Sequence, residues 1–361
     1  MMTNMTTTVQ RVMEYRKSQL FIPEGYKSLL DIKETQKAIK QIKDFFQLNL
    51  AEKLNLTRVT APRFVKSGTG INDDLNGVEI PVSFIVEGAD MVKAEIVHSL
   101  AKWKRMALVD YGFKHGEGLY TDMDAIRAQE ELDNLHSVYV DQWDWERIIS
   151  KDERSLAFLK KIVREIYKVI KITERVMHQA YPQITPILPE EIAFIHSEDL
   201  CEMYPDLTPK EREDLVCKNY GAVFLIGIGG QLKDGKPHDG RAPDYDDWSM
   251  PTKTHYRGLN GDILVWYPLL ETAFEISSMG IRVDMEALER QLKISGDTER
   301  KKLLWHKKLL SGELPLTIGG GIGQSRLCMF LLRKVHIGEV QCGIWPEEMI
   351  DKCREKGVIL L

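Results

Sequence analysis

The sequence predicts an α+β fold in which helices flank a mostly antiparallel sheet. Strand-like segments gather towards both ends of the chain, with helical segments between them. Few of these segments form the regular strand–helix–strand units that build a doubly wound parallel sheet. The 361-residue chain is 43% hydrophobic, so it can bury a sizeable core, and its length allows one large domain or two smaller ones.

Hydrophobic periodicity predicts the elements of the first half of the chain. Apolar residues at helical spacing indicate two amphipathic helices, and strict alternation over 78–86 indicates a half-buried strand in which Pro81 suits an edge or a bulge. We expect, in chain order, a helix over 33–55, strands over 78–86 and 93–98, a helix over 99–109, a strand over 136–146 and a helix over 155–179.

The strand over 136–146 carries polar side chains on one face. Gln142, Asp144 and Glu146 follow each other at every second position, and the two residues between them are tryptophans. This pattern predicts a wet cleft whose wall is backed by packed indole rings. A solvated sheet face is the simpler alternative for an isolated strand, so the prediction depends on the neighbouring segments.

The second half of the chain is punctuated by apolar strands and ends in a glycine-rich turn. We expect strands over 222–228, 262–267 and 271–283, then helices over 285–293 and 298–311, then the segment 317–326 leading into a helix. Glycines let a backbone approach a ligand closely, although a tight strand–helix junction explains such a turn more often than not. The turn is neither a phosphate-binding P-loop nor a dinucleotide fingerprint.

Composition limits the classes of partner. The formal net charge of −5 gives no broad electrostatic case for nucleic acid, although Lys102, Lys104 and Arg105 form a local basic run. The five cysteines include no CxxC pair and indicate free thiols in a reducing, cytoplasmic compartment. Because no apolar run is long enough to span a bilayer, we expect no membrane partner. Residues 1–30 are expected to form a poorly ordered N-terminal extension.

Acidic side chains mark two further places. Glu271 and Glu275 in a strand, with Asp262 at the start of the neighbouring strand, are placed to hold Mg²⁺ through oxygen ligands, although spacing alone slightly favours a solvated acidic face. The loop 241–249 contains three aspartates, and a polar surface loop would explain them as well. No histidine has metal-ligand spacing, and no Ser/His/Asp arrangement predicts a nucleophilic triad.

Taken together, these segments resemble the ammonia-dependent (type A) asparagine synthetases over roughly residues 34–347. The motifs, in the order of the family, are DDLNG (73–77), HSLAKWKR (98–105), GEGLYTDMDAIR (116–127), HSVYVDQWDWER (136–147), GAVFLIGIGG (221–230), RAPDYDDWS (241–249), GLNGDILVW (258–266), FEISSMGIRVD (274–284) and IGGGIGQSRL (318–327). Strings as long as HSVYVDQWDWER are far more specific than a short pattern.

The resemblance implies the catalytic core of class II aminoacyl-tRNA synthetases, in one catalytic domain over 31–361, and a homodimer. It also implies the reaction: ATP and L-aspartate form β-aspartyl-AMP and pyrophosphate, and ammonia then releases AMP and L-asparagine. ATP is a substrate and Mg²⁺ a cofactor in this scheme. The glycine-rich segment looks like the third signature motif of that class, ending in Arg326, and Arg127 looks like the arginine of the second motif.

The resemblance assigns a role to each matching position. The catalytic residues would be Asp73, Arg127, Asp246 and Arg326. Aspartate would be bound by Ser99, Lys104, Gln142, Asp144 and Arg282. ATP would be bound by Arg127, Glu275, Ser278, Gly321, Gly323 and Arg326, and Mg²⁺ by Asp262 and Glu275. Either Asp73 or Asp246 would hold ammonium and accept its proton, and the sequence does not rank the two.

Alternatives to this function remain open. The other asparagine synthetase family hydrolyses glutamine with an N-terminal cysteine, whereas the first cysteine here is Cys201, so we expect ammonia to be the nitrogen donor. An aminoacyl-tRNA synthetase shares the adenylate step, but we expect no anticodon-binding module of ~100 residues beside the core. A non-catalytic amino-acid sensor on the same fold is the third alternative, because fold does not settle function.

Overall fold

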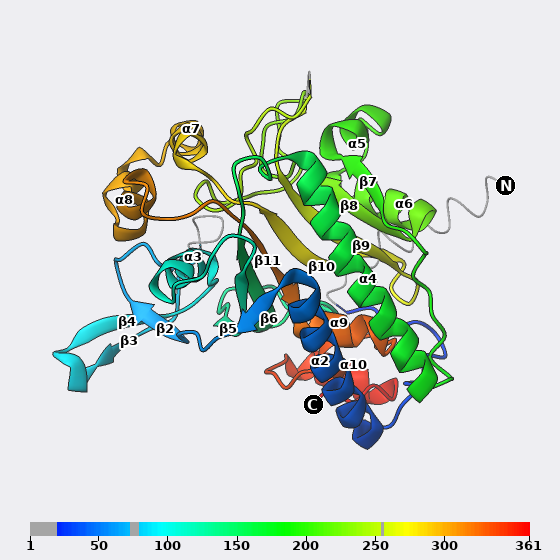
Figure 1. The fold of residues 1–361 in the computed structure, drawn as a ribbon. Coiled ribbons are helices and arrows are strands. Elements are labelled where there is room, and N and C mark those ends of the chain that lie inside the picture. Colours follow the sequence, from blue (N-terminus) through cyan, green and yellow to red (C-terminus); the bar gives the residue numbers. More distant parts are fainter. Residues whose placement is uncertain (1–19, 73–78, 254–255) are drawn as a thin grey trace.

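The computed structural model describes residues 20–72, 79–253 and 256–361, and an eight-stranded sheet forms its centre (Figure 1). Across the sheet the strands are β1 (Leu56–Arg58), β5 (Gly118–Ile126), β6 (Tyr139–Ile148), β11 (Thr317–Gly323), β10 (Thr272–Ile281), β9 (Asn260–Tyr267), β8 (Ala222–Ile226) and β7 (Ala193–His196). The six central strands pair antiparallel. The two edge strands pair parallel, β1 with β5 and β7 with β8.

The α+β class is therefore confirmed, but the sheet is mixed and the expectation of a mostly antiparallel sheet is correct only for its centre. The parallel pairings were missed because β1 and β7 have only three and four residues, too few for a periodic pattern. A parallel pair also needs a crossover connection. Between β7 and β8 two helices supply it, α5 (Ser197–Met203) and α6 (Pro209–Tyr220).

Three helices cover one face of the sheet and close the main core. They are α2 (Ile32–Leu54), α4 (Leu156–Ala180) and α9 (Gln324–Leu331). Figure 1 shows α2 and α4 as two long rods across the same side of the strands. Asp31 and Ser155 cap the N-termini of α2 and α4, each accepting a hydrogen bond from the backbone three residues on. The predictions of helices over 33–55 and 155–179 are confirmed.

Strand β6 separates the core from the polar face of the sheet. Its tryptophans, Trp143 and Trp145, are buried among the core residues, and the Trp143 ring lies 4.7 Å from that of Phe46 on α2, measured between centroids. Alternate residues of a strand point to opposite faces. Gln142, Asp144 and Glu146 therefore lie on the face that α2 and α4 leave free, as the sequence predicts.

The remaining elements complete the fold. A small sheet, β2–β4–β3, extends away from the body in Figure 1. The further elements are β2 (Phe64–Lys66), β3 (Ser83–Val86), β4 (Val92–Ile96), η1 (Glu87–Ala89), α3 (Ala101–Asp110), α7 (Met285–Ser295), η2 (Thr298–Lys302), α8 (Leu304–Leu310), η3 (Ile337–Glu339) and α10 (Glu347–Glu355). The predicted helix over 298–311 is thus two elements, and the basic run of α3 is buried rather than forming a surface patch. Helix α10 joins the main core through Met349 and Cys353.

The segment 20–30 packs against the core. Asn134 accepts a hydrogen bond from the backbone N–H of Phe21 (2.7 Å), and the Tyr26 hydroxyl donates to the Glu339 carboxylate (3.0 Å). The division of the chain at residue 30 stays a prediction. Within the described ranges, no helix combines the length and apolarity that crossing a bilayer would need.

Candidate active site

Two adjoining cavities, of about 360 and 350 Å³, lie on the polar face of the sheet. They have wall residues in common, so the two cavities lie side by side. Those shared residues are Arg127, Glu130, Gln142, Asp239, Glu275 and Gly321. We call the cavity that extends towards Arg282 the first cavity and the one that extends towards Arg326 the second cavity.

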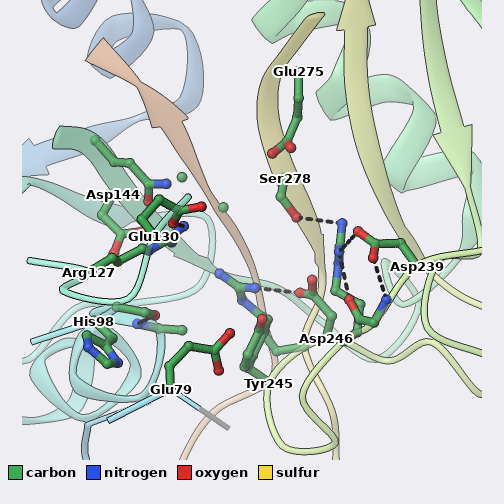
Figure 2. A pocket seen from close by; sticks show the side chains of 18 of the residues that line it. Glu79, His98, Arg127, Glu130, Asp144, Asp239, Tyr245, Asp246, Glu275 and Ser278 are labelled. Atoms are coloured by element: carbon green, nitrogen blue, oxygen red, sulfur yellow. Dashed lines mark hydrogen bonds and ion pairs between the residues drawn. The ribbon is translucent and has the colours of Figure 1, made fainter. Parts of the chain in front are cut away.

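The first cavity is built from the sheet and two loops (Figure 2). Strands β6, β10 and β11 supply Gln142, Asp144, Ser278 and two glycines to its floor. Ser99 contributes from the turn before α3. The loop between β8 and β9 adds Asp239, Gly240, Arg241, Tyr245 and Asp246. Charged groups of both signs therefore converge on a single space from segments far apart in the sequence.

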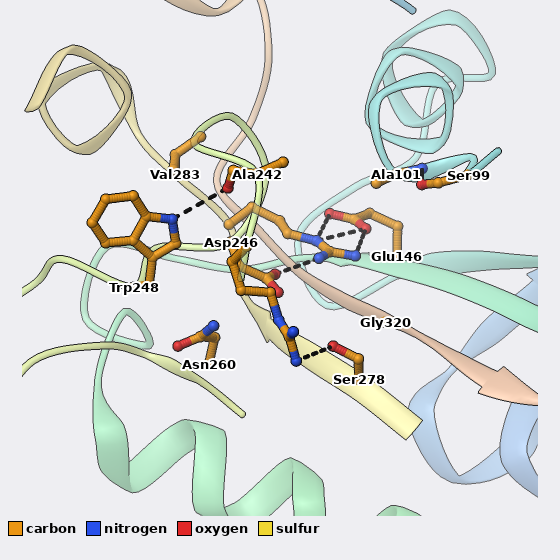
Figure 3. A network of polar contacts seen from close by, with 12 residues as sticks. Ser99, Ala101, Glu146, Ala242, Asp246, Trp248, Asn260, Ser278, Val283 and Gly320 are labelled. Carbon is orange, nitrogen blue, oxygen red and sulfur yellow. Dashed lines mark hydrogen bonds and ion pairs between the residues drawn. The ribbon is translucent and has the colours of Figure 1, made fainter. Parts of the chain in front are cut away.

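Arg282 is the buried cation at the centre of this cavity. Its Nε lies 3.1 Å and one terminal nitrogen 3.0 Å from Glu146 Oε2, and the other terminal nitrogen donates to Asp246. Figure 3 shows Glu146 and Asp246 meeting one guanidinium from two sides. A guanidinium has five N–H groups, so N–H groups remain for a bound anion. Burial opposes ionisation of Glu146, but Arg282 and Lys104 outweigh it and hold its pKa below the ordinary value.

Lys104 lies beneath the cavity floor rather than at its surface. The side chain is fully buried, and its ammonium donates to Asp144, to the carbonyl of Trp145 (3.0 Å) and to the carbonyl of Gly320 (3.4 Å). An ammonium has three donors, so all of them are used. Burial lowers the pKa of Lys104 against the pull of Asp144 and Glu146. In this geometry Lys104 orients Asp144, and it does not line either cavity.

The glycine run of β11 makes room for the carboxylate and the amide that cross it. A Cβ at Gly319 would overlap the carboxylate of Glu146, and one at Gly321 would overlap the side-chain amide of Gln142. The glycines pair in register with β6, Gly319 with Glu146 and Gly321 with Asp144. The run therefore lets polar side chains lie flat across a strand. This packing is a second explanation for the glycines, in addition to the close approach of a ligand.

Arg241 and Asp246 connect the loop over 241–249 to the floor. Arg241 donates to both oxygens of Asp262 at 2.6 Å and to the hydroxyl of Ser278 at 3.3 Å. Burial raises the pKa of Asp246, and Arg282 only partly offsets this. Burial also raises the pKa of Asp262, although Arg241 favours its ionised form. A carboxyl whose pKa is raised toward neutrality is suited to accept a proton.

The second cavity contains the end of β11 and the start of α9. Gly323, Ser325 and Arg326 line it. The guanidinium of Arg326 donates to the carbonyl of Glu275 (3.3 Å) and lies 3.6 Å from its carboxylate. Arg127, just after β5, stands where the two cavities meet and lies 3.7 Å from Glu130. Two arginines therefore face the second cavity and its junction with the first.

Of the two predicted Mg²⁺ ligands, Glu275 is better placed than Asp262 to bind a divalent cation. The carboxylate of Glu275 is 44% exposed at the junction of the cavities, with Ser278 on the same strand, whereas both oxygens of Asp262 accept from Arg241. Within the described part of the chain, no three His, Cys, Asp or Glu side chains gather as a metal site. Mg²⁺ commonly uses one or two carboxylates plus substrate phosphates and water, so Glu275 fits that donor set.

The structure brings most of the predicted site residues together. The first cavity contains Ser99, Arg127, Gln142, Asp144, Asp246, Glu275, Ser278, Arg282 and Gly321, and the second adds Gly323 and Arg326. Lys104 and Asp262 are in supporting positions, and Asp73 lies outside the described residues. Sequence reasoning gave no role to Glu146 or Arg241, although both lie within the quoted motifs. The chemical role of each residue stays a prediction.

Comparison with known proteins places the chain in a family. The family model described as aspartate-ammonia ligase matches residues 33–357. The chain is 60% identical over 344 residues to an aspartate–ammonia ligase of Parabacteroides distasonis, covering 95% of this chain and all of that protein. It is also 60% identical over 343 residues to the Clostridium perfringens aspartate–ammonia ligase, covering 95% of this chain and 99% of the relative.

Solved structures agree with the fold. The asparaginyl-tRNA synthetase of Pyrococcus horikoshii, complexed with asparaginyl-adenylate, superposes with a TM-score of 0.61 at 16% identity, covering 87% of this chain and 70% of that chain. The Entamoeba histolytica asparaginyl-tRNA synthetase with the same adenylate gives 0.61 at 15% identity, covering 86% and 66%. At this level of identity, the similarity establishes the class II synthetase fold.

Proposed function

Because the chain belongs to the aspartate–ammonia ligase family, we propose that the two cavities are the two halves of one active site. The enzyme makes L-asparagine from L-aspartate and ammonia, using ATP as a substrate. We assign aspartate to the first cavity and the nucleotide to the second. The observation that carries this assignment is the shared wall: the Arg127 guanidinium, a group suited to binding an anion, and the partly exposed Glu275 side chain line both cavities.

The reaction has two steps. A β-carboxylate oxygen of aspartate attacks the α-phosphorus of ATP, the bond from that phosphorus to the bridging oxygen breaks, and pyrophosphate leaves. Ammonia then attacks the β-carbonyl carbon of β-aspartyl-AMP, loses a proton, and AMP leaves with the former carboxylate oxygen. Both steps develop negative charge on oxygen, so they gain most from donors that are fixed before the substrates arrive.

Aspartate binding uses the polar floor. Arg282, held in place by Glu146 and Asp246, directs its remaining N–H groups to the α-carboxylate of the substrate. Gln142 and Asp144 accept hydrogen bonds from the α-ammonium, with Lys104 fixing Asp144 from below. Ser99 lines the same cavity. The alternation of fixed charges thus recognises a zwitterion and directs the β-carboxylate towards the junction.

Nucleotide binding uses the second cavity. Arg326 stacks on the adenine and reaches the outer phosphates, a combination suited to a planar guanidinium, and the backbone at Gly321 and Gly323 follows the nucleotide. Arg127 at the junction neutralises the α-phosphate. Glu275, with Ser278 beside it, would hold Mg²⁺, which supplies charge neutralisation on the phosphate oxygens. Asp262 instead fixes Arg241.

Amination requires a base that faces the activated carbonyl. Asp246 lines the first cavity, and its raised pKa favours proton acceptance. Asp73 remains the second candidate. The five cysteines are free thiols, which supports a reducing, cytoplasmic location, and the family resemblance supports a homodimer that light scattering would detect.

Product identification tests the proposed function. Purified protein with ATP, Mg²⁺, L-aspartate and ammonium should yield asparagine, AMP and pyrophosphate in equal amounts, and glutamine should not replace ammonium. Arg127→Ala should abolish pyrophosphate release, whereas Arg354→Ala, at a surface arginine whose side chain is 72% exposed on α10, should not. Binding of ATP and aspartate without pyrophosphate release would instead support a sensor.

A further inference from the structure

Asp244 is a fully buried carboxylate that the reaction chemistry does not use. It lies in the middle of the loop over 241–249, and its side chain has no exposed surface. Three basic side chains converge on the same oxygen, Oδ2. These are Lys102 of α3 (2.9 Å), Arg300 of η2 (3.1 Å) and His306 of α8 (2.9 Å). None of the four residues lines either cavity.

This cluster fixes the loop at the point where it reaches the substrate. Tyr245 and Asp246, the next two residues, both line the first cavity. Their backbone is fixed as well, because Val283 donates to the carbonyl of Tyr245 (2.8 Å) and Gln291 donates to that of Asp246 (2.9 Å). Asp244 thus secures one side of the loop to helices while the following residues present groups to the cavity.

A buried ion cluster of this kind can fix one arrangement of the chain as well as contribute to folding. Burial alone would raise the pKa of Asp244, but Lys102, His306 and Arg300 together hold it well below the ordinary value. Burying several charges is rarely more favourable than filling the same volume with apolar side chains, and a buried polar cluster can instead impose a unique arrangement. Here the arrangement imposed is that of a substrate-facing loop.

We propose that Asp244 and its three partners, Lys102, Arg300 and His306, are positioning residues for the aspartate and ammonia half of the active site. The inference rests on the proposed function. It goes further because it separates the aspartate and ammonia half of the active site from the nucleotide half. Among residues 241–249, those that line a cavity line the first one, and none lines the second. Loosening the cluster should therefore affect aspartate and ammonium while leaving the nucleotide unaffected.

The test compares His306→Leu with His306→Gln. The leucine removes the donor to Asp244, and the glutamine retains an N–H in a similar position. We expect His306→Leu to raise KM for aspartate and ammonium between about tenfold and a hundredfold, the scale of an ångström misplacement. KM for ATP should stay unchanged, and His306→Gln should recover most of the loss. Arg300→Met, at a partly exposed partner, should give the same pattern more weakly if the leucine variant folds poorly.

Glu174→Gln is the matched control, measured with thermal unfolding of every variant. Glu174 is a buried carboxylate on α4 that accepts from Arg333 and from the backbone of 187 and 188, on the opposite side of the sheet from the cavities. The Glu174→Gln variant should be less stable than the wild type, with unchanged KM values for aspartate, ammonium and ATP. The proposal is overturned if His306→Leu and Arg300→Met keep wild-type KM values, or change the KM for ATP as much as that for aspartate. Wild-type protein that makes no asparagine would refute the proposed function instead.

Discussion

Glu146 illustrates, at the scale of one residue, how a side chain can hold a cavity-lining residue without lining the cavity itself. It is fully buried, it is not among the residues that line the cavities, and it holds Arg282 through two nitrogens. Lys104 lies 3.8 Å from the same carboxylate. The orientation of the Arg282 guanidinium, which lines the first cavity, therefore depends on a carboxylate behind it.

Glu146→Gln should separate Arg282 from its anchor. Removing one partner of a buried ion pair is destabilising, so the free energy of unfolding should fall by up to about 3 kcal/mol even though Asp246 still pairs with Arg282. KM for aspartate should rise at least about tenfold because Arg282 is then held from one side only. Steady-state kinetics and chemical denaturation measure the two effects. An unchanged KM for aspartate would show that Arg282 does not depend on Glu146.

Asp246→Asn should act mainly on the amination step. Because burial raises the pKa of Asp246, the wild-type amination rate, at fixed concentration of free ammonia, should rise with pH as this carboxyl loses its proton. The asparagine variant should lose that rise and be slower by about 10²–10⁴-fold, while aspartate-dependent ATP–pyrophosphate exchange persists. Asp73→Asn, tested in parallel, decides between the two candidates. The variant that loses amination but keeps ATP–pyrophosphate exchange identifies the base, and a variant that loses both activities does not.

At the scale of elements, the glycine-rich strand β11 has a packing role that can be separated from ligand binding. Gly319→Ala places a methyl group against the Glu146 carboxylate, which Arg282 holds in place, and 2.7 Å from the backbone carbonyl of Trp145, which cannot move aside. Overpacking of this kind costs about 1–3 kcal/mol. Thermal unfolding and KM for aspartate should both worsen. A fully stable, fully active variant would remove this explanation of the glycine run.

The 3₁₀-helix η3 is capped at its N-terminus by a histidine, His336, that should make stability depend on pH. His336 is buried, its Nδ1 accepts from the backbone of Gly338 (3.0 Å), and burial lowers its pKa from 6.5 to about 4. As the pH falls below 6.5, the unfolded chain binds a proton that the folded chain does not, so stability decreases until about pH 4. The full loss is about 3 kcal/mol.

His336→Asn checks this sign. Asparagine retains an oxygen that can accept from Gly338 but does not titrate. Between pH 6.5 and 4 the free energy of unfolding should therefore fall less steeply in the variant than in the wild type, as measured by urea denaturation at several pH values. Parallel curves for the two proteins would mean that His336 is not the titrating group.

For the molecule as a whole, the sequence predicted the long helices α2 and α4, most of the central strands and most of the pocket, because their patterns are local. It missed the central strand β5 and the helices α5, α6 and α10. Long periodic segments such as 155–179 are determined by their own pattern, and the face of β6 followed from alternation alone. The edge strands β1 and β7 were missed because pairing at an edge is decided by distant partners. Lys104 was placed at the substrate because sequence position does not reveal depth.

The central claim is that aspartate and ATP meet at one junction and form an acyl-adenylate. It is tested most directly with L-aspartate carrying ¹⁸O in its β-carboxylate, followed by mass spectrometry of the products. The carboxylate oxygen that attacks the α-phosphorus stays bound to that phosphorus. When ammonia displaces AMP from the adenylate, AMP therefore carries one labelled oxygen. The account predicts AMP with one ¹⁸O for each asparagine formed. Label in inorganic phosphate or pyrophosphate, with unlabelled AMP, would contradict it.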